Sequence, residues 1–211
     1  MFTKIGNHVV KHGDICDGIE DLMGVDQADF IYTDPPWGQG TLSYWQTKNV
    51  KDNGGPDVVE KRPHKHLEFL ATFFNILVKH GKGPVIVEYG EAWKEEVLSA
   101  ATQAGLSYNE TYRSFYKSGA YLRPLHIHFF NIHTEQDWQI VRETCQHQRG
   151  QALVSALFEM FCPQNGIVLD PMCGMGFSAV AAVKRGCSFR GNELNKTRLA
   201  KTITKLKALN G

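Results

Sequence analysis

Long apolar runs, paired cysteines and an excess of charge of one sign are all missing from this sequence of 211 residues. No apolar run approaches the roughly 20 residues that a membrane-spanning helix needs, and no basic segment followed by an apolar core opens the chain. The five cysteines include no C-x-x-C pair, which argues against a disulfide framework or a zinc site and for reduced thiols. We therefore expect a cytoplasmic protein without a membrane association.

The net charge is only +1, from 23 Lys and Arg against 22 Asp and Glu. Proteins that hold nucleic acid tightly through its phosphates usually carry a larger basic excess, so any such binding must come from local patches or be weak. The length and the 42% hydrophobic content predict one globular domain, residues 1–211, with a full core. No separate target-recognition domain of normal size fits within it.

Two histidine pairs, His64 with His66 and His126 with His128, raise the question of a metal site. Neither pair has a third ligand at a recognisable spacing, and an isolated H-x-H pattern more often belongs to packing or to the surface. We therefore expect no bound metal.

The sequence does contain a stiff tetrapeptide, Asp34-Pro35-Pro36-Trp37, directly after the apolar run of residues 30–33. An aromatic and β-branched run that two prolines stop predicts a buried parallel strand and a rigid loop, which is where open α/β sheets hold ligands. The prolines remove two backbone donors, so the carbonyls of Asp34 and Pro35 are left as acceptors. Together with a carboxylate and an indole, these acceptors suit an exocyclic amino group on a planar heterocycle.

A second apolar stretch, residues 166–169, also runs into an Asp-Pro pair, Asp170-Pro171. A glycine loop and a predicted helix follow this pair. Gly174 and Gly176 let the backbone approach a ligand closely, and the start of the helix offers free N–H groups. Two Asp-Pro strand ends in one small chain indicate a functional pattern rather than a coincidence.

Together, the motifs at residues 34–37 and 170–176 resemble the catalytic and cofactor motifs of the S-adenosylmethionine-dependent amino-methyltransferases of nucleic acids. Because the catalytic motif comes first, the chain resembles the permuted β group of DNA N6-adenine and N4-cytosine methyltransferases. The resemblance extends from about Val9 to about Ala208. It implies an α/β, three-layer Rossmann-like methyltransferase fold with about seven mostly parallel strands, a terminal antiparallel hairpin and a circularly permuted motif order.

The resemblance also implies S-adenosyl-L-methionine as the cofactor, DNA as the partner and roles for individual residues. The catalytic residues would be Asp34, Pro35, Pro36 and Trp37, with the indole stacking on a flipped base. The cofactor-binding residues would be Asp14, Asp34, Asp170, Pro171, Met172, Cys173, Gly174, Gly176, Phe177, Asn192 and Glu193.

Two of these cofactor residues can also be interpreted from their position in the sequence. Glu193 lies about 20 residues after the glycine loop, at the end of the next predicted strand, where a carboxylate can take both ribose hydroxyls of a nucleoside. Asp14 follows the first predicted strand and matches the acidic residue with which the family contacts the cofactor's adenine. An aspartate that caps the next helix is an equally good interpretation of Asp14.

Residues 38–63 have few periodic apolar positions and predict a long loop, well placed to close over a substrate. Its aromatic side chains would stack on bases and its basic side chains would meet phosphates, although three acidic residues dilute the charge. The expected substrate-binding residues are Trp37, Tyr44, Trp45, Lys48, Lys61 and Arg62.

Residues 134–150 predict an irregular or weakly helical connector. In the family, the corresponding motif packs under the methionine end of the cofactor, but its usual Pro-Thr-Gln-Lys-Pro form is replaced here by residues 147–151. Only a loose assignment to Arg149 and Phe158 follows. Apolar periodicity elsewhere predicts strands at 8–11, 85–87 and 188–193, helices at 17–23, 67–78, 91–104, 151–161 and 177–185 with a last helix to about 209, and a hairpin of 108–116 with 122–132.

The resemblance implies methylation of the N6 amino group of adenine in DNA, because an Asp-Pro-Pro-Trp motif is more similar to the adenine enzymes of the family than a motif that begins with Ser. N4-cytosine in DNA and adenine in RNA are the alternatives. The target would be recognised through a short or relaxed sequence, through residues 38–63, or with the help of a homodimer or a partner subunit. Other classes are a catalytically silent nucleic-acid-binding subunit and a nicotinamide oxidoreductase, and the missing G-x-G-x-x-G motif argues against the latter.

Overall fold

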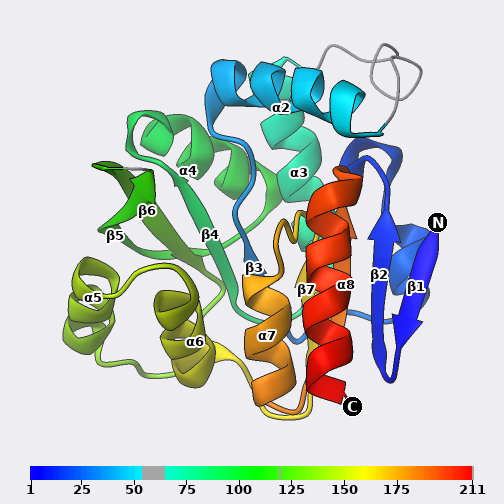
Figure 1. Cartoon of the computed structure of the whole chain (residues 1–211). Coiled ribbons are helices and arrows are strands. Elements are labelled where there is room, and N and C mark those ends of the chain that lie inside the picture. The colour runs from blue at the N-terminus through cyan, green and yellow to red at the C-terminus, as the bar shows by residue number, and fades with distance from the viewer. Residues whose placement is uncertain (54–64, 119, 211) are drawn as a thin grey trace.

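The computed structural model describes residues 1–53, 65–118 and 120–210, except for the side chains of residues 46–53 and 118. Its centre is one eight-stranded sheet with the strand order β1-β2-β8-β7-β3-β4-β6-β5 (Figure 1). The strands are β1 (Phe2–Ile5), β2 (His8–His12), β3 (Phe30–Thr33), β4 (Val85–Gly90), β5 (Tyr108–Ser118), β6 (Tyr121–Phe130), β7 (Ile167–Asp170) and β8 (Ser188–Glu193). The helices are α1 (Glu20–Met23), α2 (Gly38–Asn53), α3 (His66–His80), α4 (Lys94–Ala104), α5 (Trp138–His147), α6 (Gly150–Phe161), α7 (Phe177–Lys184) and α8 (Lys196–Asn210), with short 3-10 turns at Ile15–Asp17 and Glu91–Trp93.

Helices cover both faces of the sheet, and the alternation of side chains along β3 shows how the two cores form. Phe30 and Tyr32 face the core under α5, α6, α7 and α8, where both rings contact Phe158 at centroid distances of 4.9 and 5.7 Å. Ile31 points the opposite way, into the core under α1, α3 and α4. A strand buried on both faces must be apolar at every position, which explains the unbroken apolar run at residues 30–33.

The order of the strands creates a switch point between β3 and β7. These two strands pair in parallel, with Ile31 opposite Leu169. From β3 the chain continues through α3 to β4 on one side, whereas from β7 it continues through α7 to β8 on the other side. The expected three-layer fold and the terminal hairpin β5–β6 are confirmed, and the pairing of β3 with β7 brings the two Asp-Pro strand ends side by side.

The expected number of strands, about seven, is wrong by one, because β1 adds an antiparallel edge beside β2. Residues 6 and 7 form the short connection, and Ile5 pairs with His8 across it. This strand is short and half exposed, so it has little of the apolar pattern that marks the central strands.

Two segments expected to be irregular contain helices. Within the expected loop of residues 38–63, residues 38–53 form α2, and residues 54–63 lie outside the described part of the chain. Apolar periodicity missed α2 because this helix is polar and docks through few side chains, one of which is the buried Leu42. Within residues 134–150, α5 is capped by Asp137, whose carboxylate accepts the N–H groups of Gln139 and Ile140 at 3.1 and 3.3 Å.

Candidate active site

A cavity of about 520 Å³ opens at the carboxyl ends of the parallel strands, beside the junction of β3 and β7. Open α/β sheets bind ligands at such a position because the loops diverge there in opposite directions. Among the predicted site residues that the structure describes, only Gly176 and Tyr44 lie outside the lining. Those in the lining are Asp14, Asp34, Pro35, Pro36, Trp37, Trp45, Asp170, Pro171, Met172, Cys173, Gly174, Phe177, Asn192 and Glu193.

The tetrapeptide after β3 forms a compact loop with its polar groups at the cavity. The indole N–H of Trp37 donates to Oδ1 of Asp34 at 2.9 Å, so the ring and the carboxylate are held together. Asp34 is exposed to the open cavity, and no hydrogen-bond partner of the Pro35 carbonyl lies among the described residues. Both acceptors therefore remain available to a ligand.

A buried tyrosine that sequence reasoning missed holds this loop from below. The hydroxyl of Tyr89, in β4, donates to the carbonyl of Pro36 at 2.8 Å and accepts the N–H of Gly38 at 3.3 Å. Nε2 of His66 lies 2.8 Å from the same hydroxyl. Because the single tyrosine proton goes to Pro36, the imidazole must donate its own, and burial lowers the pKa of His66 so that it is neutral at pH 7.

Three carboxyl groups meet at the strand ends: Asp34 after β3, Glu88 in β4 and Asp170 at the end of β7. The hydroxyl of Tyr32 donates to Glu88. Burial and the nearby Asp34 charge raise the pKa of Glu88 to about 8, so this group is largely protonated at pH 7. Asp34 is open to the cavity, but the protein around it excludes much of the bulk water, and this desolvation raises the pKa of Asp34 to about 6 even though the Trp37 hydrogen bond and the Arg198 charge lower it. Asp34 is therefore mostly ionised at pH 7.

The glycine loop after β7 is held by carboxylates on both sides. Asp170 accepts the hydroxyl of Ser178 at 2.5 Å and the N–H of Met172 at 3.1 Å. Burial is the main cause that raises the pKa of Asp170 to about 7. Glu193, at the end of β8, accepts the N–H of Gly174 at 2.8 Å and that of Asn195 at 2.7 Å, so its carboxylate braces the glycine loop against the end of β8.

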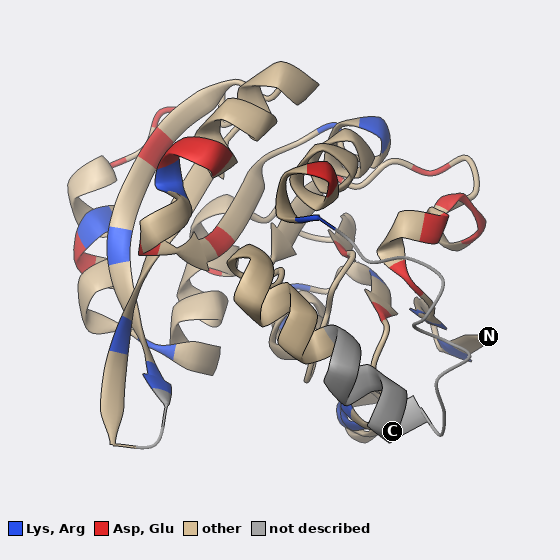
Figure 2. Cartoon of the chain, turned by 90° about the horizontal axis from the view of Figure 1, so that it is seen from above, with Lys and Arg blue, Asp and Glu red and all other residues tan. Residues whose placement is uncertain are grey.

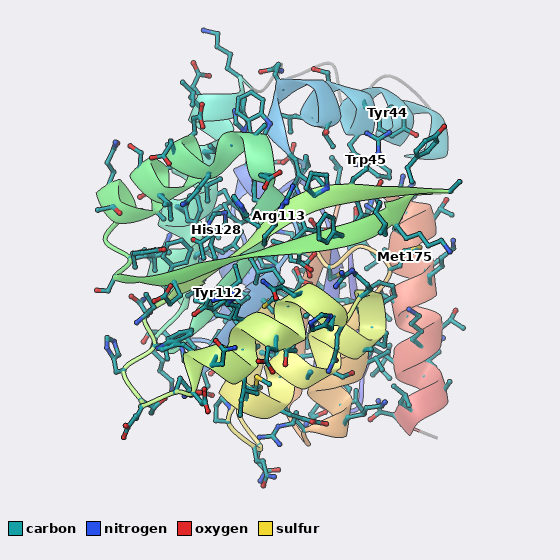
Figure 3. All side chains as sticks on the ribbon, turned by 90° about the vertical axis from the view of Figure 1, so that its left-hand side faces the viewer. Tyr44, Trp45, Tyr112, Arg113, His128 and Met175 are labelled. Carbon is teal, nitrogen blue, oxygen red and sulfur yellow. The ribbon has the colours of Figure 1, made fainter. Side chains whose placement is uncertain are left out.

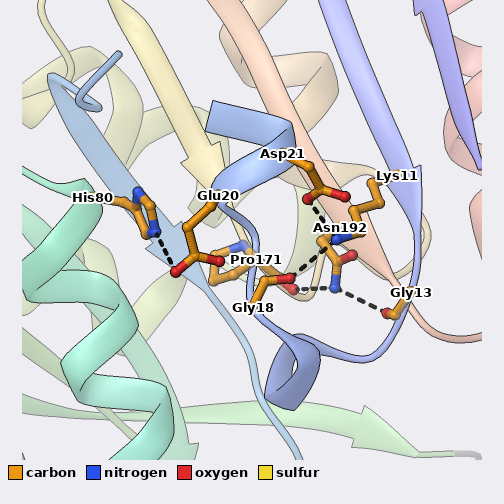
Figure 4. A network of polar contacts seen from close by, with 8 residues as sticks. All are labelled: Lys11, Gly13, Gly18, Glu20, Asp21, His80, Pro171 and Asn192. Atoms are coloured by element: carbon orange, nitrogen blue, oxygen red, sulfur yellow. Dashed lines mark hydrogen bonds and ion pairs between the residues drawn. The ribbon is translucent and has the colours of Figure 1, made fainter. Parts of the chain in front are cut away.

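Asn192 joins the glycine loop to the loop after β2, as Figure 4 shows. Its amide nitrogen donates to the carbonyls of Gly13 and Pro171, both at 3.1 Å. Its side-chain oxygen is buried and has no partner within the described chain, although the residue lines the cavity. Asp14 lies next to this junction, where its carboxylate accepts the N–H of Cys16 at 2.9 Å and caps the 3-10 turn at Ile15–Asp17. Asp14 therefore has the capping role that was one of its two interpretations, and it also lines the cavity.

The predicted substrate residues of the segment after Trp37 are only partly brought together. Figure 3 places Tyr44 and Trp45 on α2, where Trp45 packs on the guanidinium of Arg198, 4.3 Å from the ring centroid. Arg198 belongs to α8 and lines the cavity, so this contact joins α2 to the side of the cavity that the glycine loop lines. The side chain of Lys48 and the whole of Lys61 and Arg62 lie outside the described part of the chain.

The loose assignments at the connector do not reach the cavity. The guanidinium of Arg149 donates to backbone carbonyls at the end of α5, including that of Cys145 at 3.3 Å, and packs against Phe115 at 5.4 Å. Phe158 lies in the core between α6 and β3. One signal for the missed residues was in the sequence, since the acidic Glu88 directly follows an apolar strand run and Tyr89 comes next.

Neither a membrane-spanning helix nor a cluster of metal-binding side chains occurs in the described part of the chain. No helix there is long and apolar enough to cross a membrane. No group of three or more metal-binding side chains occurs over residues 1–53, 65–118 and 120–210.

Solved structures with a similar fold exist, whereas no family model and no curated protein matches the chain. The complex of M1.HpyAVI with SAM has a TM-score of 0.64 at 15% identity, with 93% of this chain and 98% of that chain covered. PvuII DNA methyltransferase, which is specific for cytosine N4, has a TM-score of 0.64 at 10% identity, with 98% and 92% covered. TTHA0409 from Thermus thermophilus in complex with S-adenosyl-L-methionine has a TM-score of 0.59 at 16% identity, with 96% and 94% covered.

Proposed function

We propose that the chain is a cytoplasmic S-adenosylmethionine-dependent methyltransferase that acts on the N6 amino group of adenine in DNA. One observation carries the proposal. The Asp34 carboxylate and the Pro35 carbonyl offer acceptors at the same cavity that the glycine loop and Glu193 line. The similar folds of the DNA methyltransferase PvuII and of the M1.HpyAVI complex with SAM support it.

The residues of the cavity fit this cofactor. A volume of about 520 Å³ is in the usual range for a site that binds a nucleoside-sized molecule. Glu193 would hold the ribose hydroxyls, since it is a carboxylate at the end of the strand after the glycine loop and it lines the cavity. The buried side-chain oxygen of Asn192 needs a donor, and Asp14 would accept from the adenine amino group.

When bound, S-adenosylmethionine supplies a methyl group that is activated by a sulfonium, and the cofactor is a neutral thioether once the methyl group has been transferred. The residues of this chain prepare the nitrogen, whose lone pair is delocalised into the base. Asp34 and the Pro35 carbonyl would accept hydrogen bonds from the two N–H groups of the amino nitrogen. These bonds favour tetrahedral geometry at the nitrogen and free its lone pair for attack. The nitrogen becomes acidic once it is methylated, and Asp34 then takes its proton towards solvent. Trp37, held by Asp34 at 2.9 Å, would stack on the flipped base.

The choice of adenine rests on the Asp34-Pro35-Pro36-Trp37 form of the motif, which is more similar to adenine enzymes than to cytosine enzymes. N4-cytosine in DNA and N6-adenine in RNA are the alternatives of the same class. A catalytically silent subunit is the alternative of another class, and the open Asp34 carboxylate argues against it. The target would be recognised through a short or relaxed sequence, through residues 38–63, or with the help of a second copy or a partner subunit.

The test is a direct product assay. Purified protein is incubated with S-adenosylmethionine and separate DNA and RNA pools, which are then digested to nucleosides for mass spectrometry. N6-methyladenine in the DNA alone is the expected result. Methylcytosine or methylated RNA would select an alternative, and cofactor binding without any methylated nucleoside would refute the proposal for the isolated chain.

The Asp34→Ala variant separates chemistry from cofactor binding. Because Asp34 acts on the target base and not on the glycine loop, transfer should fall below detection while the dissociation constant for S-adenosylmethionine stays within several-fold of the wild-type value. Isothermal calorimetry measures the second quantity. An equal collapse of cofactor binding would show that the role assigned to Asp34 is wrong.

A further inference from the structure

We infer that the outer half of hairpin β5–β6 binds the DNA strand that carries the target base. This half, which we call the hairpin tip, comprises residues 115–117 and 121–123. The inference rests on the proposed function and deepens it, because it assigns the substrate contact to the far end of the sheet rather than to the segment after Trp37.

The order of the strands divides the cavity into two halves. The strands β7, β8 and β2, which carry the glycine loop, Glu193 and Asp14, lie on one side of β3. The strands β4, β6 and β5 lie on the other side. A cofactor held by the first group leaves only the second side for the approach of a substrate to Asp34. On that side the cavity is lined by Glu88 of β4 and by four residues of the hairpin, which are Phe115, Tyr116, Arg123 and Leu125.

The hairpin tip is in contact with the loop of residues 34–37. The ring of Tyr116 meets the indole of Trp37 edge to face, with a centroid distance of 5.5 Å. Tyr116 pairs with Arg123 across the hairpin, so their side chains share one face. Alternate residues of a strand face the same side, so Tyr121 continues this face outward from Arg123 and Leu125. A continuous aromatic and basic surface therefore runs from Trp37 to the end of the hairpin.

The side chains at the tip are exposed without an evident structural reason. Tyr121 is 74% exposed, and Leu122 beside it is 60% exposed. Tyr116 is 42% exposed even though it touches Trp37. Water-exposed aromatic rings at the mouth of a cavity offer flat faces on which bases can stack, whatever the base.

The charge of the tip is complementary to DNA. Residues 111–128 contain three basic residues and no acidic one, in a chain whose net charge is only +1. Arg113 is neutralised by Glu91, whose carboxylate lies 2.8 Å from its guanidinium. Within the described chain, no carboxylate lies within ion-pair distance of Lys117 or Arg123. Figure 2 shows basic and no acidic colouring on the outer part of this hairpin, up to its grey turn.

These features assign separate roles at the tip. Arg123, at the rim of the cavity, would meet a phosphate next to the flipped nucleotide. Tyr121, farther out on the same face, would stack on a neighbouring base. Tyr116 is a positioning residue, since it steadies the indole that holds the target base.

The experiment measures DNA binding separately from methyl transfer. Fluorescence anisotropy with labelled single-stranded and duplex oligonucleotides compares the wild-type protein with Arg123→Ala and Tyr121→Ala, in the presence of S-adenosylhomocysteine. The matched controls are Arg142→Ala on α5 and Tyr108→Ala at the opposite end of the same hairpin, because both side chains are exposed and distant from the tip. Melting temperature and cofactor affinity are measured for every variant.

Each tip variant should bind DNA roughly tenfold more weakly, with unchanged cofactor affinity and melting temperature, while the control variants match the wild type. Arg123→Ala should also lower the slope of log affinity against log salt concentration by about 0.7 to 0.9, the loss of one phosphate contact. The value of kcat at saturating DNA should change little, so the defect appears in KM.

The two proposals fail in different ways. Methylation of DNA by tip variants with wild-type KM and affinity would overturn the hairpin assignment and leave the proposed function intact. Weaker DNA binding by the tip variants, in a protein that methylates nothing, would support the hairpin and overturn the proposed function. Wild-type protein that binds no DNA, or that binds only a matched RNA, would overturn the hairpin assignment as stated.

Discussion

The hydroxyl of Tyr89 offers the sharpest test of how the loop of residues 34–37 is held. In Tyr89→Phe, the ring stays and only this hydroxyl is lost, together with its contacts to the Pro36 carbonyl, the Gly38 N–H and His66 at 2.8, 3.3 and 2.8 Å. A hydrogen bond contributes about 0.5 to 1.5 kcal/mol net, and buried partners left unpaired cost more. We expect the free energy of unfolding to fall by about 2 to 3 kcal/mol.

The effect on activity should be larger on kcat than on binding. Without the hydroxyl, the Pro36 carbonyl and the Gly38 N–H lose their common anchor, so the acceptors of Asp34 and Pro35 shift relative to the target nitrogen. A misplacement of about 1 Å can cost on the order of 100-fold in rate. We expect kcat to fall by roughly 10- to 100-fold. The affinity for S-adenosylmethionine should stay within about twofold, because the hydrogen bonds of the Tyr89 hydroxyl go to Pro36, Gly38 and His66 and not to the glycine loop.

The assay combines single-turnover methylation, cofactor calorimetry and denaturant unfolding for Tyr89→Phe and for a control, Tyr112→Phe. The Tyr112 hydroxyl has no hydrogen-bond partner within the described chain, so this control removes the same atom without breaking a contact. It should keep wild-type kcat and stability. Wild-type kcat in Tyr89→Phe, or a parallel loss of cofactor affinity, would refute the positioning role.

Three further predictions concern the cavity. Gly176→Ala should lower the free energy of unfolding by about 2 to 3 kcal/mol and weaken cofactor binding, because φ is +76° and the new Cβ would lie 2.8 Å from Oγ1 of Thr202. The control is Gly105→Ala, where φ is +104° and nothing lies within 4 Å of the new Cβ. For this control, calorimetry should find only the backbone cost of about 1 kcal/mol. The rate of methyl transfer should fall about tenfold per pH unit below about pH 6, since in the proposed mechanism Asp34 must be ionised to accept a hydrogen bond from the target amino group. A flat single-turnover profile from pH 5 to 8 would contradict this role. The raised pKa of Glu88, about 8, favours folding while the group is protonated, and this stability is lost as pH rises through 8. The melting temperature of Glu88→Gln should therefore fall less between pH 6 and pH 9 than that of the wild type. Equal losses in the two proteins would count against the raised pKa of Glu88.

Local patterns carried much of what could be predicted from the sequence. Strands buried on both faces are apolar at every position, so residues 30–33 and 166–169 were identifiable, and the Asp-Pro pairs after them marked the ends of these strands. Helices with a broad apolar face, such as α3, were identifiable from their spacing. In contrast, α2 presents few apolar side chains and depends on contacts such as Trp45 on Arg198, which no periodicity reveals.

The residue types of the site were determined by the sequence alone, since an acid, two prolines and an indole next to each other need no long-range contact to be recognised. The tertiary structure decided which distant groups act on them. Tyr89 holds the Pro36 carbonyl across a separation of 53 residues, and His66 bonds to the Tyr89 hydroxyl across 23 residues, only because β4 lies beside β3 and α3 packs under both. Glu88 acquires its raised pKa only because the sheet buries it near Asp34 and Asp170. The strand order sets these contacts, and it depends on the packing of the whole sheet rather than on any local pattern.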